Sequence, residues 1–261
     1  MKKNRWKKGI ALFLSITAIF TGSMIPVQAS EYWPQAPETA SPCVMVMEMN
    51  TGAVLYEKNV DEVHYPASIT KIMTALVTLE HCTNLDDTVV FNQEVMDSIS
   101  SNSSTLNPVA VLDEEMSVRD ALFGLMLNSA NECASALAVY TAGSIDAFVE
   151  MMNEKAAELG ATGTHYVNAH GLDNEDHYTT AHDMAIIFDA ALKNDTFRYI
   201  DSQATHTIPA TNKSAERTCG STNQLINGAL SYEGVYAGKT GHTAMAGRTS
   251  VSYTHLTLPT T

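Results

Sequence analysis

The sequence predicts an α+β fold in which one antiparallel sheet, made from both ends of the chain, carries a block of helices. Near the N-terminus, two apolar runs flank Asn50-Thr51-Gly52, a pattern typical of a β-hairpin with Gly in its turn. Helical spacing of apolar residues dominates the middle of the chain, and strand patterns return over residues 232–250. Because strands and helices are segregated along the chain instead of alternating, an antiparallel sheet is favoured over a parallel one.

The first predicted helix holds Ser68 and Lys71 in the stretch PASITKIMTAL. Its apolar face is made by Ile69, Ile72, Met73, Leu76 and Leu79. A lysine so close to an apolar face needs a partner or a chemical role, because an unpaired buried charge is costly. Between this helix and the next, residues 84–115 are mixed, with a short strand expected at 88–91 and a Ser/Asn-rich loop at 98–105.

Three further helical segments are predicted, and the residues at their starts suit helix N-termini. Residues 117–142 are mostly helical, with Ser117 and Asp120 as a capping box and a break near Asn128-Ser129. The next helix runs from about residue 144 to 160, and the last spans 180–194 with a second capping box at its start. Residues 164–180 resemble a loop, and 232–250 read as strand, turn and strand.

Residues 1–29 are predicted to be a secretory signal peptide. They combine five basic residues and no acid with a short apolar run and a small residue, Ala29, before the expected cleavage site. The alternative is a transmembrane helix, but the apolar run is too short to span a bilayer. The whole chain carries a net charge of −14, and the part after Ala29 is still more acidic, so nucleic acid and anionic lipid are not expected partners.

Residues 251–261 are expected to be a non-native tail. The string VSYTHLTLPTT ends the chain without a turn or helix pattern, and its start matches what one reading frame of a common sequencing adaptor encodes. An ordinary exposed tail is the alternative. Residues 30–250 are then predicted to form one catalytic domain that is incomplete at its C-terminus.

The four cysteines are Cys43, Cys82, Cys133 and Cys219. An even number in an exported chain permits disulfides without requiring them, so their redox state stays open. Cys43 and Cys133 lie in apolar runs and are expected to be small buried side chains. No metal site is expected, because the cysteines lack CxxC spacing and the nine histidines suggest no ligand triad.

Three short motifs point to nucleophilic catalysis. Ser68 and Lys71 are three residues apart, so they share a helix face where a neutral lysine could take the serine proton. Ser129-Ala130-Asn131 interrupts a helical region with groups that could relay a proton and orient an amide. Lys239-Thr240-Gly241 lies on a predicted strand, where charge and hydroxyl could hold a carboxylate and Gly lets a ligand approach.

Each motif alone has an ordinary structural explanation: helix capping, a polar kink and a β-turn. Their combination and order, S-x-x-K, S-x-N and K-T-G, are much more specific. With the strings NTGAVLYEKN, NAHGL and GKTGHT, the chain resembles the serine-type D-alanyl-D-alanine carboxypeptidases, the low-molecular-mass penicillin-binding proteins of the β-lactamase/transpeptidase-like superfamily. The resemblance covers residues 43–250, and the family's sheet is expected to need further strands and a helix after the K-T-G strand.

The resemblance implies a role for each motif residue. Ser68 would be the nucleophile and Lys71 its base, while Ser129 and Asn131 would transfer protons and bind the substrate amide. Lys239 and Thr240 would hold the terminal carboxylate of a peptidoglycan stem peptide, and Gly241 would let the substrate backbone approach the strand. The oxyanion would be bound by the main-chain N–H groups of Ser68 and His242.

The same resemblance implies β-lactam antibiotics as covalent inhibitors, no cofactor, and a membrane contact only through a C-terminal anchor absent from this sequence. His170 and His177 lie in family-like text outside the motifs and are interpreted as structural. A D,D-endopeptidase remains an alternative function. A class A β-lactamase is less favoured, because no E-x-x-L-N string lies between Asn131 and Lys239. A non-enzymatic β-lactam sensor is also less favoured, because such a domain is attached to a multi-span membrane protein.

Overall fold

The structure is a computed structural model that describes residues 36–101, 103–230, 232 and 234–254. Contacts divide the chain into two units, Met1–Thr39 and Ala40–Thr261, and the description below concerns the second. The predicted signal peptide lies outside the described residues and stays a prediction. Within the described ranges, no helix is both long enough and apolar enough to cross a membrane.

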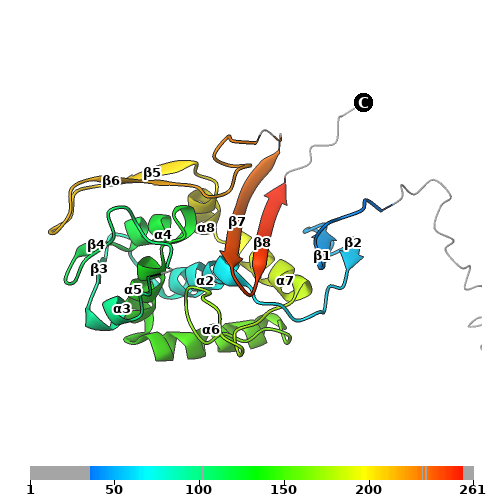
Figure 1. The fold of residues 1–261 in the computed structure, drawn as a ribbon, viewed down its shortest axis with the longest axis horizontal. Helices are drawn as coiled ribbons and strands as arrows, with labels where there is room; N and C mark the ends of the chain where they lie inside the picture. The colour runs from blue at the N-terminus through cyan, green and yellow to red at the C-terminus, as the bar shows by residue number, and fades with distance from the viewer. Residues whose placement is uncertain (1–35, 102, 231, 233, 255–261) are drawn as a thin grey trace, which may run out of the picture. The chain divides into compact units, whose positions relative to one another are not determined.

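The helical block is centred on α2 (Lys71–His81), which is preceded by a single 3-10 turn, η1 (Ala67–Thr70). Most of α2 is buried, and it packs against helices from every later part of the block (Figure 1). These helices are α4 (Val118–Leu127), α5 (Asn131–Ala142), α6 (Ile145–Leu159), α7 (Ala181–Leu192) and α8 (Asp195–Asp201), with the short α3 (Gln93–Asp97) packing on α5. The apolar face predicted for the first helix therefore lies at the centre of the core.

Ser117 and Thr180 cap their helices as predicted, and Ser144 caps the helix that was predicted to start near it. The side chains of Ser117, Ser144 and Thr180 accept hydrogen bonds from main-chain N–H groups in the first turns of α4, α6 and α7. Such caps satisfy donors that the helix itself leaves unpaired, which is why they mark helix starts in a sequence. The segment 180–194 ends earlier than predicted, at Leu192, and Asn194 caps a separate helix, α8, that the sequence did not indicate.

The strands form four antiparallel pairs, so the predicted single sheet is wrong in this respect, although the α+β class is confirmed. The pairs are β1 (Val44–Met47) with β2 (Val54–Lys58), β3 (Thr88–Val90) with β4 (Glu115–Ser117), β5 (Thr205–Ile208) with β6 (Arg217–Gly220), and β7 (Val235–Thr243) with β8 (Gly247–Thr254). The first and last pairs come from the two chain ends and are separate in Figure 1. A sheet requires hydrogen bonds between neighbouring edges. Among the described residues, no strand joins β1–β2 to β7–β8, and β1 packs on α7 while β7 packs on η1.

Strand β8 continues to Thr254, four residues into the segment expected to be a non-native tail. Val251, for example, pairs with Lys239 of β7. This pairing does not test the origin of the segment, which stays a prediction. Residues 255–261 lie outside the described part of the chain.

All four cysteines are free thiols. Cys133 is fully buried, as predicted, against Gly124 of α4, where a β-carbon added to the glycine would lie only 2.7 Å from the cysteine sulfur. The prediction for Cys43 is wrong, because this residue is only partly buried. Strand β1, which it precedes, belongs to a two-stranded pair with little cover, so an apolar run here does not imply a core position.

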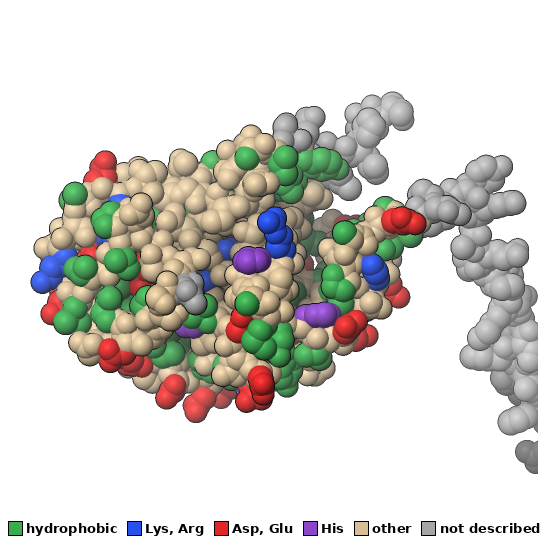
Figure 2. Space-filling view, in the orientation of Figure 1, with side chains coloured by type: hydrophobic (Ala, Val, Ile, Leu, Met, Phe, Trp, Pro, Cys, Tyr) green, Lys and Arg blue, Asp and Glu red, His purple; other side chains and the backbone are tan. Residues whose placement is uncertain are grey.

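Acidic side chains are spread along the margin of the face in Figure 2, in keeping with the net negative charge.

Candidate active site

Ser68 lies in the 3-10 turn η1, where three separate segments converge. The residue before it, Ala67, has a left-handed backbone with φ of 52°, a conformation that costs a non-glycine residue roughly 1–2 kcal/mol. The turn is held from one side by β8, since Thr249 Oγ1 donates a 2.8 Å hydrogen bond to the carbonyl of Pro66. On another side, the backbone at Gly171 packs directly against η1. A β-carbon added to Gly171 would lie only 1.9 Å from the Ala67 carbonyl oxygen. Strain and close packing thus fix the position of Ser68.

Lys71 is buried completely and its amine makes three polar contacts. Its Nζ lies 3.1 Å from Ser68 Oγ, 2.8 Å from Asn131 Oδ1 and 2.7 Å from the main-chain carbonyl of His170. Two of these partners, Ser68 and Asn131, belong to the predicted motifs, and the third is a main-chain carbonyl. Ser129, the other polar residue of the second motif, contacts Lys239 instead.

The pKa of Lys71 is held well below its usual value, first by burial and then by the positive charge of Lys239. A neutral amine has two N–H donors and one lone pair. The amide oxygen of Asn131 and the carbonyl of His170 can accept the two donors, which leaves the lone pair for the hydroxyl of Ser68. The geometry therefore suits a lysine that accepts the serine proton.

Ser129 and Asn131 flank the break between α4 and α5, as the sequence predicted. Ser129 adopts a left-handed backbone with φ of 56°, and Asn131 is the first residue of α5. The turn is fixed by a 2.8 Å hydrogen bond from the Asn131 N–H to the Ser104 carbonyl. It directs the two side chains to different lysines, Asn131 to Lys71 and Ser129 to Lys239.

Lys239 enters the site from β7 and is also buried. Its Nζ donates to Ser129 Oγ at 3.0 Å and to the Thr240 carbonyl at 2.7 Å. Burial lowers the pKa of Lys239 to about 8, and the nearby carboxyl of Asp201 opposes that fall. Lys239 therefore keeps its proton over most of the neutral range, and its charge is the one that acts on Lys71.

The other residues of the K-T-G strand line the approach to Ser68. Gly241 faces the main-chain nitrogen of Ser68, which a side-chain carbon on the glycine would approach to 2.8 Å. The Thr240 hydroxyl is 2.9 Å from that of Thr222, a contact that the sequence did not indicate. His242 is exposed and lies opposite Arg248 in the β7–β8 register. Its predicted role concerns its main-chain N–H and stays a prediction.

Two buried carboxyls beside the lysines were missed from the sequence. Glu132 follows Asn131 in α5, and Asp201 ends α8. Burial raises the pKa of each to about 7. Each has one carboxylate oxygen without a hydrogen-bond partner among the described residues. For Glu132 the available signal was an acid within a mostly apolar helix, which is weak, because most such acids are solvated on an outer face. For Asp201, at the end of a polar helix, the sequence carried no comparable signal.

The rings of His170 and His177 make hydrogen bonds within the loops that carry them and to Thr70, in line with their structural interpretation. Each accepts a main-chain N–H at Nδ1, from Leu172 and Val167 respectively. His177 Nε2 is 2.8 Å from the buried Thr70 hydroxyl. Burial lowers the pKa of His170 to about 3 and that of His177 to about 4, so both rings are neutral.

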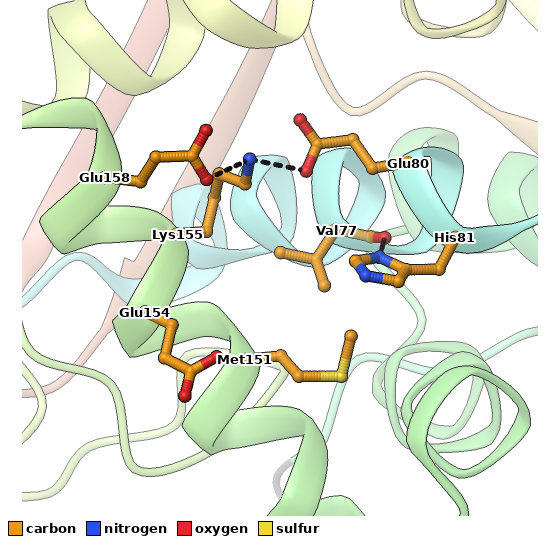
Figure 3. Close-up of a pocket in the computed structure, with 7 residues that line it drawn as sticks. All are labelled: Val77, Glu80, His81, Met151, Glu154, Lys155 and Glu158. Atoms are coloured by element: carbon orange, nitrogen blue, oxygen red, sulfur yellow. Dashed lines mark hydrogen bonds and ion pairs between the residues drawn. The ribbon is translucent and has the colours of Figure 1, made fainter.

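A pocket of about 340 Å³ lies between α2 and α6, but it holds none of the motif residues (Figure 3). Lys155 bridges its rim by contacts of 2.8 Å to Glu80 and 2.6 Å to Glu158. Because Lys155 is already paired with two glutamates and no residue of the pocket belongs to a motif, the motif cluster is the better candidate site.

Comparison with known proteins agrees with this geometry. The family model for D-alanyl-D-alanine carboxypeptidase (Peptidase_S11) matches residues 30–257. The chain belongs to this family. The D-alanyl-D-alanine carboxypeptidase DacF of Bacillus subtilis is 35% identical over 207 residues, which are 77% of this chain and 51% of that protein. This chain therefore spans about half of that relative's length.

Two other relatives extend the comparison. A D-alanyl-D-alanine endopeptidase of Pseudomonas aeruginosa is 32% identical over 97% of this chain and 79% of its own length. The crystal structure of a D-alanyl-D-alanine carboxypeptidase from Mycobacterium tuberculosis superposes with a TM-score of 0.77 at 31% identity. That match covers 88% of this chain and 83% of the other. The penicillin-binding fold is thus shared along with the sequence.

Proposed function

We propose that this protein is a serine D-Ala-D-Ala carboxypeptidase that removes the terminal D-alanine from peptidoglycan stem pentapeptides. The observation that carries the proposal is the 3.1 Å contact between Ser68 Oγ and a buried Lys71 amine whose pKa is lowered. Family membership supports the reaction class. The proposed location is outside the cytoplasmic membrane, where the substrate lies, which accords with the leader-like N-terminus.

In the proposed acylation step, Lys71 Nζ takes the proton of Ser68 as its Oγ bonds to the carbonyl carbon between the two D-alanines. The carbonyl oxygen becomes an oxyanion facing the main-chain N–H groups of Ser68 and His242. The peptide C–N bond then breaks, and the leaving amine of D-alanine receives the proton that Lys71 took, passed on through Ser129 and Asn131, so that Lys71 is neutral again. An ester on Ser68 remains.

Substrate positioning is assigned to Lys239 and Thr240. A protonated Lys239 and the Thr240 hydroxyl would bind the free carboxylate of the terminal D-alanine by charge-assisted hydrogen bonds. In deacylation, Lys71 would take a proton from water as the water oxygen attacks the ester, and Ser68 Oγ would regain a proton as it leaves. A β-lactam would acylate Ser68 in the same way and leave slowly.

The test is intact-mass spectrometry of the full chain after incubation with a penicillin, with Ser68→Ala alongside. One drug mass should be added to the wild type and none to Ser68→Ala. No adduct on a wild-type chain with a folded circular dichroism spectrum would contradict the acyl-enzyme proposal. Rapid release of hydrolysed drug would instead indicate a β-lactamase.

A D,D-endopeptidase is the second candidate, supported by the similarity to the Pseudomonas aeruginosa endopeptidase. The two activities differ only in what occupies the leaving side of the scissile bond. Release of D-alanine from a soluble pentapeptide would indicate the carboxypeptidase. Cleavage of a D,D-cross-linked muropeptide dimer, without release of D-alanine from the pentapeptide, would indicate the endopeptidase.

A further inference from the structure

Three side chains with metal-binding chemistry meet away from the motif residues. Cys43 precedes β1, and Glu62 and His64 lie in the segment between β2 and η1. Their potential ligand atoms all lie within 4.8 Å of one another. Cys43 Sγ is 2.9 Å from His64 Nε2 and 3.9 Å from Glu62 Oε2, and His64 Nε2 is 3.4 Å from Glu62 Oε1.

The main chain brings these donors together independently of their own side chains. His64 exchanges two main-chain hydrogen bonds with Thr179, of 2.8 and 2.9 Å. The segment before Cys43 is held to the end of β2 by bonds from Lys58 Nζ to the Ser41 carbonyl and from Asn59 Nδ2 to the Pro42 carbonyl. The donors therefore lie on two segments whose relative position is already fixed, which reduces the entropy that a metal would have to overcome.

The donor set favours one class of ion. Thiolate, imidazole and carboxylate are the three ligand types of zinc, whereas magnesium and calcium take oxygen ligands. With zinc bond lengths, tetrahedral angles place neighbouring sulfur and nitrogen ligands roughly 3.5 Å apart, and nitrogen and oxygen roughly 3.4 Å apart. The distance of 3.4 Å between His64 Nε2 and Glu62 Oε1 matches. The Cys43 sulfur is 2.9 Å from His64 Nε2, roughly 0.6 Å closer than zinc ligands lie, and 3.9 Å from the second Glu62 oxygen, Oε2. On binding zinc, the Cys43 sulfur would move away from His64, and Glu62 would bind through one of its two oxygens.

We propose that Cys43, Glu62 and His64 bind one zinc ion, with water as the fourth ligand. The side chains of His64 and Glu62 are 41% and 54% exposed, so water and metal can both reach the site. The ion would link the start of β1 to the segment that leads, four residues after His64, to Ser68. It lies outside the Ser68–Lys71 cluster, so its role would be to stabilise this junction, and its binding does not depend on the proposed hydrolase activity.

The experiment uses the reduced, metal-free full chain titrated with Zn²⁺, and with Co²⁺ as a spectroscopic probe. We expect one zinc per chain and a thiolate-to-cobalt charge-transfer band in the near ultraviolet. Cys43→Ser should abolish the band, and His64→Gln should weaken zinc binding at least 10- to 100-fold, since even outer-shell changes cost that much. Cys82→Ser is the matched control, because Cys82 is also a partly buried free thiol, but its sulfur makes its polar contacts with the Asn84 carbonyl and the Tyr140 hydroxyl.

A second measurement distinguishes zinc binding at the proposed site from nonspecific binding of zinc to a cysteine thiol. Saturating zinc should raise the thermal unfolding midpoint of the wild type and of Cys82→Ser but not of Cys43→Ser, because a ligand stabilises only the state that binds it. The proposal is overturned if the folded wild type gives no cobalt band. It is also overturned if Cys43→Ser binds zinc as tightly as the wild type. The close contact between Cys43 and His64 would then be a hydrogen bond and nothing more.

Discussion

The two buried lysines of the site occupy similar surroundings and yet end in different charge states. Lys71 and Lys239 are both buried and both hydrogen-bond to a side chain of the S-x-N segment. Each also lies near a buried carboxyl whose pKa is raised to about 7, Glu132 for Lys71 and Asp201 for Lys239. Burial lowers the pKa of both lysines. The pKa of Lys71 is held well below its usual value, and that of Lys239 is lowered to about 8.

Burial is the largest influence on the pKa of both lysines, and the two differ in the sign of the next charge. Lys71 has a cationic neighbour, Lys239, which lowers its pKa further, whereas the Asp201 carboxylate raises that of Lys239. Two positive charges repel each other strongly in a low-dielectric site. One of the two amines is therefore expected to lose its proton. The pair thus supplies a neutral base and a fixed cation from the same residue type. Acylation should therefore rise with pH as Lys71 loses its proton and fall again above about pH 8 as Lys239 loses its own.

Removing the base should have the largest effect. Lys71→Met keeps an unbranched side chain that is only one atom shorter and deletes the amine proposed to accept the Ser68 proton. We expect the second-order rate of acylation by a penicillin to fall by roughly 10²- to 10⁴-fold, the usual contribution of a positioned base. Stopped-flow or quenched mass spectrometry would measure this rate.

Lys155→Met is the matched control for this variant. It removes a lysine that bridges Glu80 and Glu158 at the remote pocket and should leave acylation unchanged (Figure 3). A Lys71→Met rate within about tenfold of the wild type would exclude Lys71 as the base.

Removing the cation should have two separable effects. Lys239→Met loses a charge-assisted hydrogen bond to the ligand carboxylate, worth about 1.5–3 kcal/mol, or roughly 10- to 150-fold in acylation. It also removes the charge that lowers the pKa of Lys71, so Lys71 should hold its proton to a higher pH. The acid limb of the pH–rate profile should move upward. An acid limb that stays in place would mean that burial alone sets the pKa of Lys71.

Neutralising the two buried carboxyls, Asp201 and Glu132, should have the smallest effects on the pH–rate profile. Asp201→Asn removes the charge that raises the pKa of Lys239, so the basic limb should move below about pH 8. The Asp201 carboxyl, with a pKa of about 7, is mostly ionised on that limb, so its loss should be visible. Glu132→Gln should change the acid limb less, because that limb lies at lower pH, where the Glu132 carboxyl, with a pKa of about 7, is ionised to a smaller extent than Asp201 is on the basic limb. Equal shifts in the two variants would contradict this asymmetry.

Local features of the fold were predictable because their signals are local. The capping residues Ser117 and Thr180 and the three-residue spacing of Ser68 and Lys71 need only a few neighbouring residues to be recognised. The strand order was not predictable in the same way. Apolar patterns indicate that β1 and β8 exist, but only contacts between distant segments decide whether their edges pair.

The motif residues that meet in the structure were indicated by the sequence, whereas two of the groups around them were not. Asp201 acts on Lys239 from α8, and the His170 carbonyl that accepts from Lys71 belongs to the main chain, which leaves no residue-type signal. The Cys43, Glu62 and His64 cluster was missed for a similar reason. A search for CxxC spacing or a histidine triad cannot find a set whose first member is 19 residues from the second.

The contacts that define the site have a consequence for folding. Lys71 meets Asn131 across 60 residues and His170 across 99, and Lys239 meets Ser129 across 110. Contacts of such high sequence separation must wait for the closure of long loops and form only when most of the chain is in place. A partly folded chain can hold the helix with Ser68 and yet lack its base geometry. Covalent labelling by a penicillin should therefore count completely folded molecules, which makes the drug a folding probe for this protein.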